Sequence, residues 1–409
     1  MPPEPAVPLP RFLIRQPLLD VRYRVLGYEF GLRDRMPVEV LPGASGLDQA
    51  RDEHLIASVV DLEFQHALGE KLTLLDLAPA SLDNPMLAQL PPGKIGLALA
   101  ASTPELSRRS AALAGADLLP VLDDDGANPP VALPPGCDVV RLDSGRHDAL
   151  SLGERAGYLR HLGVKRLIAG NVGSEEAFEV CRKLAFDIYQ GDFLALPRAT
   201  GARKLDAGVV QVMELLNLAR EQAPIDRMEA AIKRNAVLTY RLLRYINSPA
   251  NGLGRAMQSI GQALLWLGHD PLYRWLTLLL FSAGGGDGRG EALLRNALVR
   301  ARFMENLGAP RLEPGQRGGL FIVGILSHLD ALLNLPMSQA IEPLKLPDAM
   351  RDALLDGTGR YAPWLRLARA CEHFDQDAVA TLATGNGLSA DEVNLAHVNA
   401  LIWSESVEK

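Results

Sequence analysis

Residues 11–33, RFLIRQPLLDVRYRVLGYEFGLR, decide how the fold begins. The pattern predicts a short apolar strand at Phe12, Leu13 and Ile14, a polar turn at residues 20–24, and a second strand over residues 25–33. Because the connecting turn is so short, the two strands must lie antiparallel. This stretch therefore predicts that the fold opens with a pair of antiparallel strands.

Glu29 lies inside the apolar second strand, near its end. Burying a carboxylate without a partner is costly, so this residue needs an explanation. One explanation is a salt bridge to Arg33 or Arg15. The other is a metal or ligand site at the mouth of a barrel, and this stretch leaves both open.

The composition is that of a globular protein, with 48% apolar and 22% charged residues among 409. A chain of this length is expected to form two or three domains. The net charge of −7, without a run of Lys or Arg, argues against a nucleic-acid partner. The longest nearly unbroken apolar run, residues 275–283, is far shorter than the ~20 residues of a membrane span.

The cysteines and the N-terminus favour a cytoplasmic protein. Cys137, Cys181 and Cys371 are too widely spaced for a CxxC metal site or a disulfide framework, which fits a reducing compartment. Residues 1–8, MPPEPAVP, lack the basic and apolar regions of a signal peptide. We expect them to form a flexible arm.

Residues 9–199 alternate between strand-like and helix-like segments, which predicts an α/β domain with a parallel sheet closed as a barrel. This barrel should be TIM-like but shortened, with its first strand antiparallel. The predicted strands are 12–14, 25–33, 71–76, 94–99, 118–122, 138–142, 166–169 and 186–189. The predicted helices between them are 48–68, 80–90, 103–114, 150–162 and 174–184.

The strand pattern ends at a short polar linker, residues 200–207, and residues 208–409 read as an all-α domain. Capping-box patterns at Ser259 to Gln262 and Ser389 to Glu392 mark two helix starts. The predicted helices are 208–221, 227–234, 238–246, 260–267, 272–281, 291–306, 319–333, 347–355, 363–374 and 391–403.

Polar side chains gather at the predicted carboxyl ends of the strands, where barrel enzymes carry their active sites. They are Glu29, Asp76, Asp123, Asp124, Asp125, Asp143 and Gln190. Carboxylates that converge on one mouth suit Mg²⁺ or Mn²⁺, and two such ions can activate a water. The alternative is that residues 123–126 are merely an acidic turn.

These residues carry a resemblance to EAL domains, the cyclic di-GMP phosphodiesterase family. Arg15-Gln16-Pro17 with residues 27–33, GYEFGLR, looks like the family's opening. Three further motifs follow in the family's order: residues 121–126 resemble its DDFG loop, residues 138–143 its D-x-x-K-I-D strand, and residues 190–197 its closing Q-G-x-x-x-x-x-P. The resemblance covers roughly residues 11–197 and implies a barrel whose first strand is antiparallel.

The departures from the family pattern imply a degenerate site. The metal-binding Asn of the third strand falls at Asp76, and residues 95–99 contain no carboxylate where the next ligand is expected. The lysine that helps to activate water falls at Arg141, which stays charged and cannot replace it. We expect Arg141 to pair with Asp143, Asp123 or a ligand phosphate. The loop A-E-G-V-E-T reads AGNVGS at residues 169–174, without either glutamate.

The all-α half resembles the HDOD domain, a relative of HD phosphohydrolases, through residues 242–249, 259–268 and 323–333. The His-Asp doublet of those enzymes falls at Ser327-His328, and Asp330 lies two residues beyond His328. Residues two apart do not share a helix face, so we expect no metal here. Together the halves resemble bacterial EAL–HDOD two-domain signalling proteins.

We therefore expect a signal-transduction regulator related to cyclic di-GMP that is not an enzyme and binds other signalling proteins through its helical domain. The alternatives are a receptor that binds cyclic di-GMP without hydrolysis and an active metal-dependent phosphodiesterase. A homodimer is left open. The candidate ligand-binding residues are Gln16, Glu29, Arg33, Asp124, Arg141 and Gln190. No cofactor is expected; a single Mg²⁺ or Mn²⁺ would use Glu29, Asp76, Asp123 and Asp124.

Overall fold

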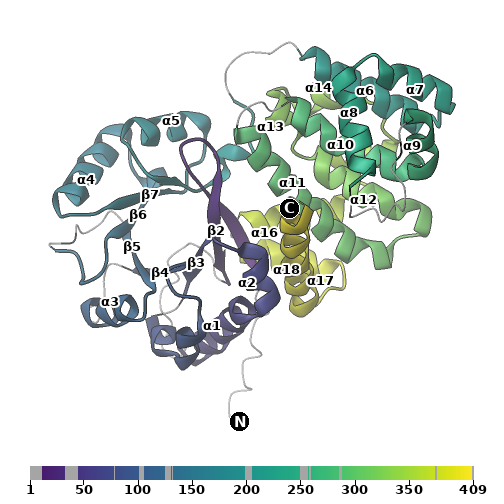
Figure 1. The fold of residues 1–409 in the computed structure, drawn as a ribbon. Coiled ribbons are helices and arrows are strands. Elements are labelled where there is room, and N and C mark those ends of the chain that lie inside the picture. The colour runs from purple at the N-terminus through teal and green to yellow at the C-terminus, as the bar shows by residue number, and fades with distance from the viewer. Residues whose placement is uncertain are drawn as a thin grey trace, which may run out of the picture.

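The computed structural model describes residues 12–32, 45–77, 79–100, 106–124, 130, 132–198, 205–248, 257, 259–284, 288–373 and 375–407. Two parts lie side by side: a barrel that carries its helices outside, and a helical part formed by the second half of the chain (Figure 1). The expected flexible arm, residues 1–8, and the candidate residue Arg33 lie outside the described residues.

The sheet is a closed barrel in which neighbours in the sequence are neighbours in space. Its strands are β1 (Ile14–Leu19), β2 (Val25–Gly31), β3 (Leu72–Asp76), β4 (Ile95–Ala100), β5 (Leu119–Asp124), β6 (Val139–Asp143), β7 (Arg166–Gly170) and β8 (Ile188–Tyr189). β1 is antiparallel to both β2 and β8, and all other pairs are parallel. The predicted fold class, including the antiparallel first strand, is confirmed.

The first strand was predicted at residues 12–14, but it begins at Ile14 and continues through Pro17. Proline has no N–H for a ladder, so it weighs against a strand in a sequence. Here Pro17 still pairs with Tyr28 in the register of β1 and β2. The predicted turn is present, and the Asp20 carboxylate fixes it by accepting from the main-chain N–H groups of Arg22 and Arg24 at 2.8 Å each.

Helices and 3-10 turns cover the outside of the barrel (Figure 1). They are α1 (Ser45–Val60), α2 (Leu62–Leu68), η1 (Pro79–Asp83), η2 (Pro85–Gln89), α3 (Leu106–Gly115), η3 (Ser144–Arg146), α4 (Ala149–His161), α5 (Glu175–Lys183) and η4 (Asp192–Leu194). The helix predicted at 80–90 is instead the two 3-10 turns, because Pro85 follows Asn84 and Asn84 caps a new turn. The helix predicted at 48–68 is interrupted at Asp61, whose carboxylate accepts from the Phe64 N–H.

The inside of the barrel is filled by one apolar layer of Leu18, Leu74, Ala98, Val121, Val139, Ile168 and Ile188. Side chains alternate between the two faces of a strand, so residues two positions further along also point inward. The inward positions at the carboxyl ends of the strands are therefore Asp76, Asp123, Arg141, Gly170 and Gln190. Glu29 of β2 also points inward, because it pairs in register with Leu74 of the apolar layer. This alternation decides which polar residues meet at the mouth.

The helical half consists of α6 (Ala207–Arg220), α7 (Ile225–Lys233), α8 (Ala236–Ile246), α9 (Ile260–Leu267), α10 (His269–Gly284), α11 (Gly288–Gly308), η6 (Ala309–Arg311), α12 (Pro314–Leu326), α13 (Leu329–Leu333), α14 (Met337–Ile341), α15 (Asp348–Leu355), α16 (Ala362–Glu372), α17 (Gln376–Gly385) and α18 (Ala390–Val407). The helix predicted at 319–333 is two helices separated at Ser327-His328. The sequence did not predict α14 and α17. Both capping boxes are at helix starts, with Ser259 and Ser389 accepting from Gln262 and Glu392.

The C-terminal helices pack against the beginning of the barrel. The Phe12 N–H donates to Gln376 Oε1 at 3.0 Å, and the Leu13 N–H donates to Asn394 Oδ1 at 2.6 Å. The Leu13 carbonyl lies 3.1 Å from Nδ1 of His397, which is buried. The N-terminal edge of β1 is thus held by side chains that come more than 360 positions later.

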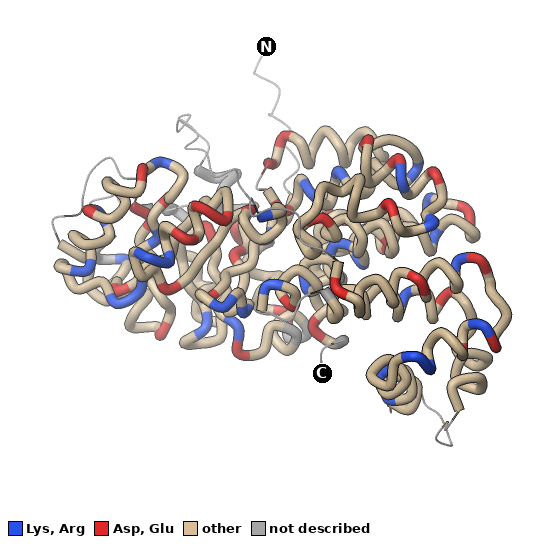
Figure 2. Tube along the Cα trace, turned by 90° about the horizontal axis from the view of Figure 1, so that it is seen from above, with Lys and Arg blue, Asp and Glu red and all other residues tan. Residues whose placement is uncertain are grey.

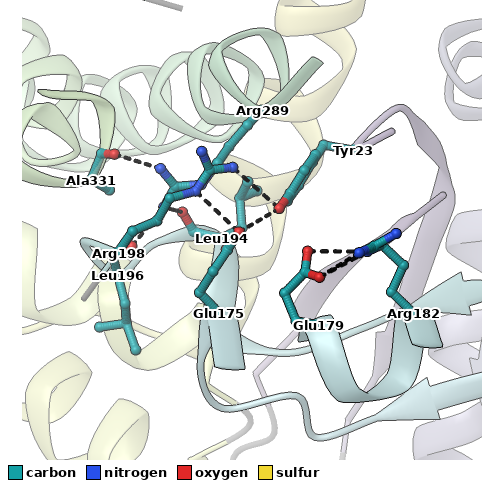
Figure 3. A network of polar contacts seen from close by, with 9 residues as sticks. All are labelled: Tyr23, Glu175, Glu179, Arg182, Leu194, Leu196, Arg198, Arg289 and Ala331. Carbon is teal, nitrogen blue, oxygen red and sulfur yellow. Dashed lines mark hydrogen bonds and ion pairs between the residues drawn. The ribbon is translucent and has the colours of Figure 1, made fainter. Parts of the chain in front are cut away.

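Arg289 of α11 joins the two halves where the barrel ends. Its guanidinium donates to the carbonyls of Leu194 and Leu196, after β8, at 3.2 and 2.6 Å. The same side chain donates to the Ala331 carbonyl of α13 at 2.7 Å, and Figure 3 shows it pointing between these segments. The two halves are therefore fastened together close to the point where the chain passes from one to the other.

Candidate functional site

The polar residues of the barrel mouth gather around Arg141, which points inward from β6. Its Nε and Nη2 donate to the two carboxylate oxygens of Asp123 at 2.6 Å each. Its Nη1 donates to Glu29 Oε1 and lies 3.5 Å from Gln190 Oε1. Gln190 in turn donates to the other oxygen of Glu29. Glu29 of β2, Asp123 of β5, Arg141 of β6 and Gln190, which directly follows β8, form one network that we call the mouth network.

The side chains of the mouth network are largely buried. The Glu29 side chain is 1% exposed, that of Arg141 11%, and that of Asp123 33%. Burial lowers the pKa of Arg141, but the charges of Asp123 and Glu29 outweigh it and raise that pKa well above its usual value. Arg141 is therefore a permanent cation between two carboxylates, and Glu29 is buried because it is paired.

The salt-bridge explanation for Glu29 is right in kind, but the sequence did not point to this partner. The structure pairs Glu29 with Arg141, which is 112 positions away. Arg15 faces the other side of β1, where its guanidinium lies 4.9 Å from the centre of the Tyr28 ring. Of the acids expected to pair with Arg141, Asp143 instead pairs with Arg146 at 3.1 Å.

Gly170 makes room for Arg141. A Cβ atom at Gly170 would lie 3.3 Å from Cγ and 3.4 Å from Cδ of Arg141. By the resemblance given above, Gly170 stands where EAL domains carry a glutamate. The aliphatic part of Arg141 thus packs closely against the place where a side chain at position 170 would begin.

Asp124 is not part of the mouth network. Adjacent strand residues point to opposite faces, so Asp123 faces the interior and Asp124 faces the outer helices. There Asp124 is fully buried and accepts two hydrogen bonds from Arg155 of α4, at 2.6 and 2.5 Å. The structure thus separates Asp124 from the residues with which it was grouped as a ligand-binding and metal-binding candidate. The sequence offered no signal for Arg155.

Gln16 lies at the joint between the two halves. It faces Glu29 across the β1–β2 pair, but its amide nitrogen lies 3.4 Å from Asp192 Oδ1 and 3.2 Å from the Glu372 carbonyl of α16. Nδ1 of His373 is 3.0 Å from the same Asp192 oxygen. Asp192 and His373 were not predicted as site residues, because nothing in their sequence positions indicates that α16 reaches the rim of the barrel.

In this structure the two carboxylates of the mouth network are paired with the guanidinium of Arg141. Within the described residues, no group of three or more His, Cys, Asp or Glu side chains could hold a metal ion. Asp76 is inward at the end of β3, opposite Ala98 on β4, which has no side-chain oxygen. A cation at Glu29 and Asp123 would have to displace the guanidinium of Arg141 from both carboxylates.

In the helical half, Arg300 lies beside Ser327-His328 and binds polar groups on two sides. Nη1 of Arg300 donates to Ser327 Oγ at 2.7 Å, and Nε and Nη2 donate to the two oxygens of Glu372. His328 is 1% exposed, and its burial, together with the charge of Arg300, lowers its pKa well below the usual value. His328 is therefore uncharged, and it lies beside an ion pair.

Residues 205–338 match the family model described as the HDOD domain. This segment is an HDOD domain. The cyclic di-GMP phosphodiesterase CdgJ of Vibrio cholerae serotype O1 is 24% identical over 407 residues, covering 97% of this chain and 93% of the relative. The uncharacterized protein YuxH of Bacillus subtilis is 25% identical over 410 residues, covering 97% and 98%. The chain thus resembles EAL–HDOD two-domain signalling proteins over nearly its full length.

The barrel also has counterparts among solved structures. One is the FimX EAL domain from Pseudomonas aeruginosa bound to c-di-GMP, with 20% identity and a TM-score of 0.35. That comparison covers 45% of this chain and 88% of the FimX chain.

Two further features bear on partners. Within the described residues, no helix combines the length and apolarity that crossing a bilayer requires. Basic and acidic positions are interspersed through both described halves (Figure 2). The expectation that nucleic acid is not a partner stays a prediction.

Proposed function

We propose that this protein is a non-hydrolysing regulator in cyclic di-GMP signalling, whose barrel is a scaffold and whose HDOD domain acts by contact with other proteins. The observation that supports it is that the guanidinium of Arg141 pairs with the carboxylates of both Glu29 and Asp123. The link to cyclic di-GMP comes from the likeness to the phosphodiesterase of Vibrio cholerae over nearly the whole chain.

The chemistry of hydrolysis supports the same proposal. Two-metal hydrolysis of a phosphodiester needs carboxylates that hold both cations and position a water between them. A guanidinium cannot polarise a water as a divalent ion does, and it cannot accept a proton at any working pH. Ala98 and Gly170 provide no side-chain oxygen for a further cation. We therefore expect that the barrel neither binds a catalytic metal nor cleaves the dinucleotide.

A second candidate is a receptor that binds cyclic di-GMP without cleaving it. One observation favours it: Asp123 is one-third exposed, so a phosphate arriving from solvent can reach the outer edge of the Arg141 fork. Arg–phosphate pairs are bidentate like the Arg141–Asp123 pair, so a phosphate could replace Asp123 there. The remaining carboxylates of the mouth oppose a dianion, which is why we place this candidate second.

The test is turnover of cyclic di-GMP by the full-length protein with excess Mg²⁺ or Mn²⁺. We expect no linear pGpG above the level of buffer. Production of pGpG that disappears in Glu29→Ala would overturn the proposal. Calorimetry with cyclic di-GMP, with and without Mg²⁺, separates the two candidates: heat of binding without turnover supports the receptor, and no heat supports the protein-contact regulator.

A further inference from the structure

The exposed apolar side chains of this protein are concentrated on two neighbouring helices of the HDOD domain. Among the described residues, five of the twelve exposed large hydrophobic side chains lie on α8 and α9: Val237, Tyr240, Tyr245, Leu265 and Trp266. Single exposed apolar residues are normal on a protein surface, but a group of them on adjoining elements marks an interaction site.

The exposed positions of α8 form one stripe. Val237, Tyr240, Arg241 and Arg244 follow the i, i+3, i+4, i+7 spacing that places side chains on one helix face. The opposite face, with Leu238, Leu242 and Ile246, is buried against the rest of the domain.

α9 adds its own solvent face. Leu265 is 68% and Trp266 45% exposed, whereas Ile260, Ala263 and Leu264 on the other face are buried. α8 and α9 pack together and lie with α7 at the end of the helical half far from the barrel (Figure 1). We call Val237, Tyr240, Arg241, Arg244, Leu265 and Trp266 the α8–α9 surface.

The charged residues of the α8–α9 surface, Arg241 and Arg244, are both positive. Neither α8 nor α9 contains an aspartate or a glutamate. Among the described residues, Arg241 and Arg244 have no ion-pair partner. Glu214 of α6 pairs with Arg234, and Glu229 of α7 pairs with Lys233, both at 2.6 Å.

We propose that the α8–α9 surface is the docking site for an acidic amphipathic helix of a partner protein. Tyr240, Leu265 and Trp266 receive the partner's apolar side chains, and Arg241 and Arg244 pair with carboxylates beside them. Tyrosine, tryptophan and arginine are the residue types that carry most of the binding energy in protein interfaces. This inference rests on the proposed function and deepens it by naming the surface and the chemistry of the partner.

A second copy of this chain is a poorer occupant. In a two-fold dimer formed through this face, the same patch meets itself, so Arg241 and Arg244 would approach their own copies. Like charges across an interface oppose association. The charge of the α8–α9 surface therefore selects a partner that brings carboxylates of its own.

The experiment uses two fluorescein-labelled helical peptides that share one leucine and phenylalanine face. One peptide carries glutamates beside that face, and the other carries lysines at the same positions. Fluorescence anisotropy with the full-length protein should show binding of the acidic peptide that is on the order of tenfold tighter than that of the basic peptide. High salt should reduce this difference.

The decisive variant is the double charge reversal R241E/R244E, which should reverse the preference and favour the basic peptide. A reversal cannot arise from unfolding, so it tests the contact itself. Tyr240→Ala should weaken the acidic peptide on the order of tenfold. Tyr158→Ala is the matched control, because Tyr158 is a partly exposed tyrosine on barrel helix α4 and its loss should leave peptide binding unchanged.

The proposal is overturned if the protein binds neither peptide, if it does not distinguish them, or if R241E/R244E keeps the original preference. A concentration-dependent dimer that Tyr240→Ala abolishes would likewise overturn it, in favour of a second copy. The turnover assay is independent of these results. If the peptide test fails and no pGpG is produced, only the assignment of the α8–α9 surface is wrong. If pGpG is produced, the proposed function itself is wrong.

Discussion

The guanidinium of Arg141 binds the carboxylate of Asp123 side by side, Nε to Oδ1 and Nη2 to Oδ2, both at 2.6 Å. This is the two-pronged geometry in which arginine recognises carboxylates and phosphates. Its third nitrogen, Nη1, reaches Glu29 on the other side of the mouth. One side chain thus binds both carboxylates that the barrel brings together there.

Removing Arg141 should destabilise the protein strongly. Arg141→Met leaves the buried carboxylate of Glu29 without its cation, and breaking a buried pair costs roughly 3–5 kcal/mol. The lower end of that range is expected, because Asp123 is partly exposed and can be solvated. The measurement is the free energy of unfolding from urea titration.

The matched control for this substitution is Arg146→Met, because Arg146 is half exposed and pairs with Asp143 at the surface. Exposed pairs contribute about 0–1 kcal/mol, so little change is expected. Equal losses in the two variants would contradict the role given to Arg141.

Gly170 and Arg141 should be energetically coupled. Gly170→Ala places a methyl group 3.3 Å from Cγ of Arg141, so we expect a loss of about 1 kcal/mol as the arginine shifts. In the Arg141→Met background a more flexible side chain takes that space and the loss should shrink. A double-mutant cycle of unfolding free energies measures this coupling. Strict additivity would show that the two positions do not share the space.

His397 should make the stability fall on acidification. Its burial and the charge of Arg15 lower the pKa of His397 from 6.5 to about 3, while Glu372 acts in the opposite direction. A histidine whose folded-state pKa is depressed opposes folding once the unfolded chain takes up the proton. Stability is therefore full above pH 6.5 and is lost as the pH falls from 6.5 toward 3.

The test compares unfolding free energies of the wild type and His397→Asn at pH 7.5 and 5.5. Asparagine retains a polar group near the Leu13 carbonyl but does not titrate. We expect the wild type to lose about 1 kcal/mol more than the variant over this interval. His161, exposed on α4, is the control, and His161→Asn should keep the wild-type pH dependence. A parallel decline in His397→Asn and the wild type would exclude His397 as the source.

Cutting the chain between the two halves should leave them associated. The sequence predicts a polar linker at residues 200–207, where a protease site can be inserted between Arg198 and Leu205. Main-chain bonds of Phe12 and Leu13 to the C-terminal helices, and those of Arg289 to Leu194 and Leu196, all survive the cut. After cleavage we expect the fragments to co-elute in size-exclusion chromatography as one folded particle. Separate elution would indicate that these contacts do not hold the halves together.

Much of the barrel could be read from local sequence. Apolar runs separated by helical segments identified eight strands, and the short turn at residues 20–24 required the first two to be antiparallel. The limits of strands and helices were less accurate where proline stands inside an element, as at Pro17 and Pro85. Local patterns succeed because alternation and turn length are properties of neighbouring residues.

The sequence by itself also determined which residues are available at the mouth. It identified Glu29, Asp123, Arg141 and Gln190 as candidates, and it identified the positions without a side-chain carboxylate, at Ala98 and Gly170. Those conclusions depend only on residue type and on the place of each residue at the end of a strand.

Only the tertiary structure decided how these groups pair. Arg141 is 18 positions from Asp123 and 112 from Glu29, and Asp124 turns away to Arg155. Ion pairs form between charges that the closed barrel brings within a few ångströms, and no local pattern encodes that distance. The contact of Gln16 with Glu372 has the same origin, because strand β1 and helix α16 meet only when the two halves of the chain have packed.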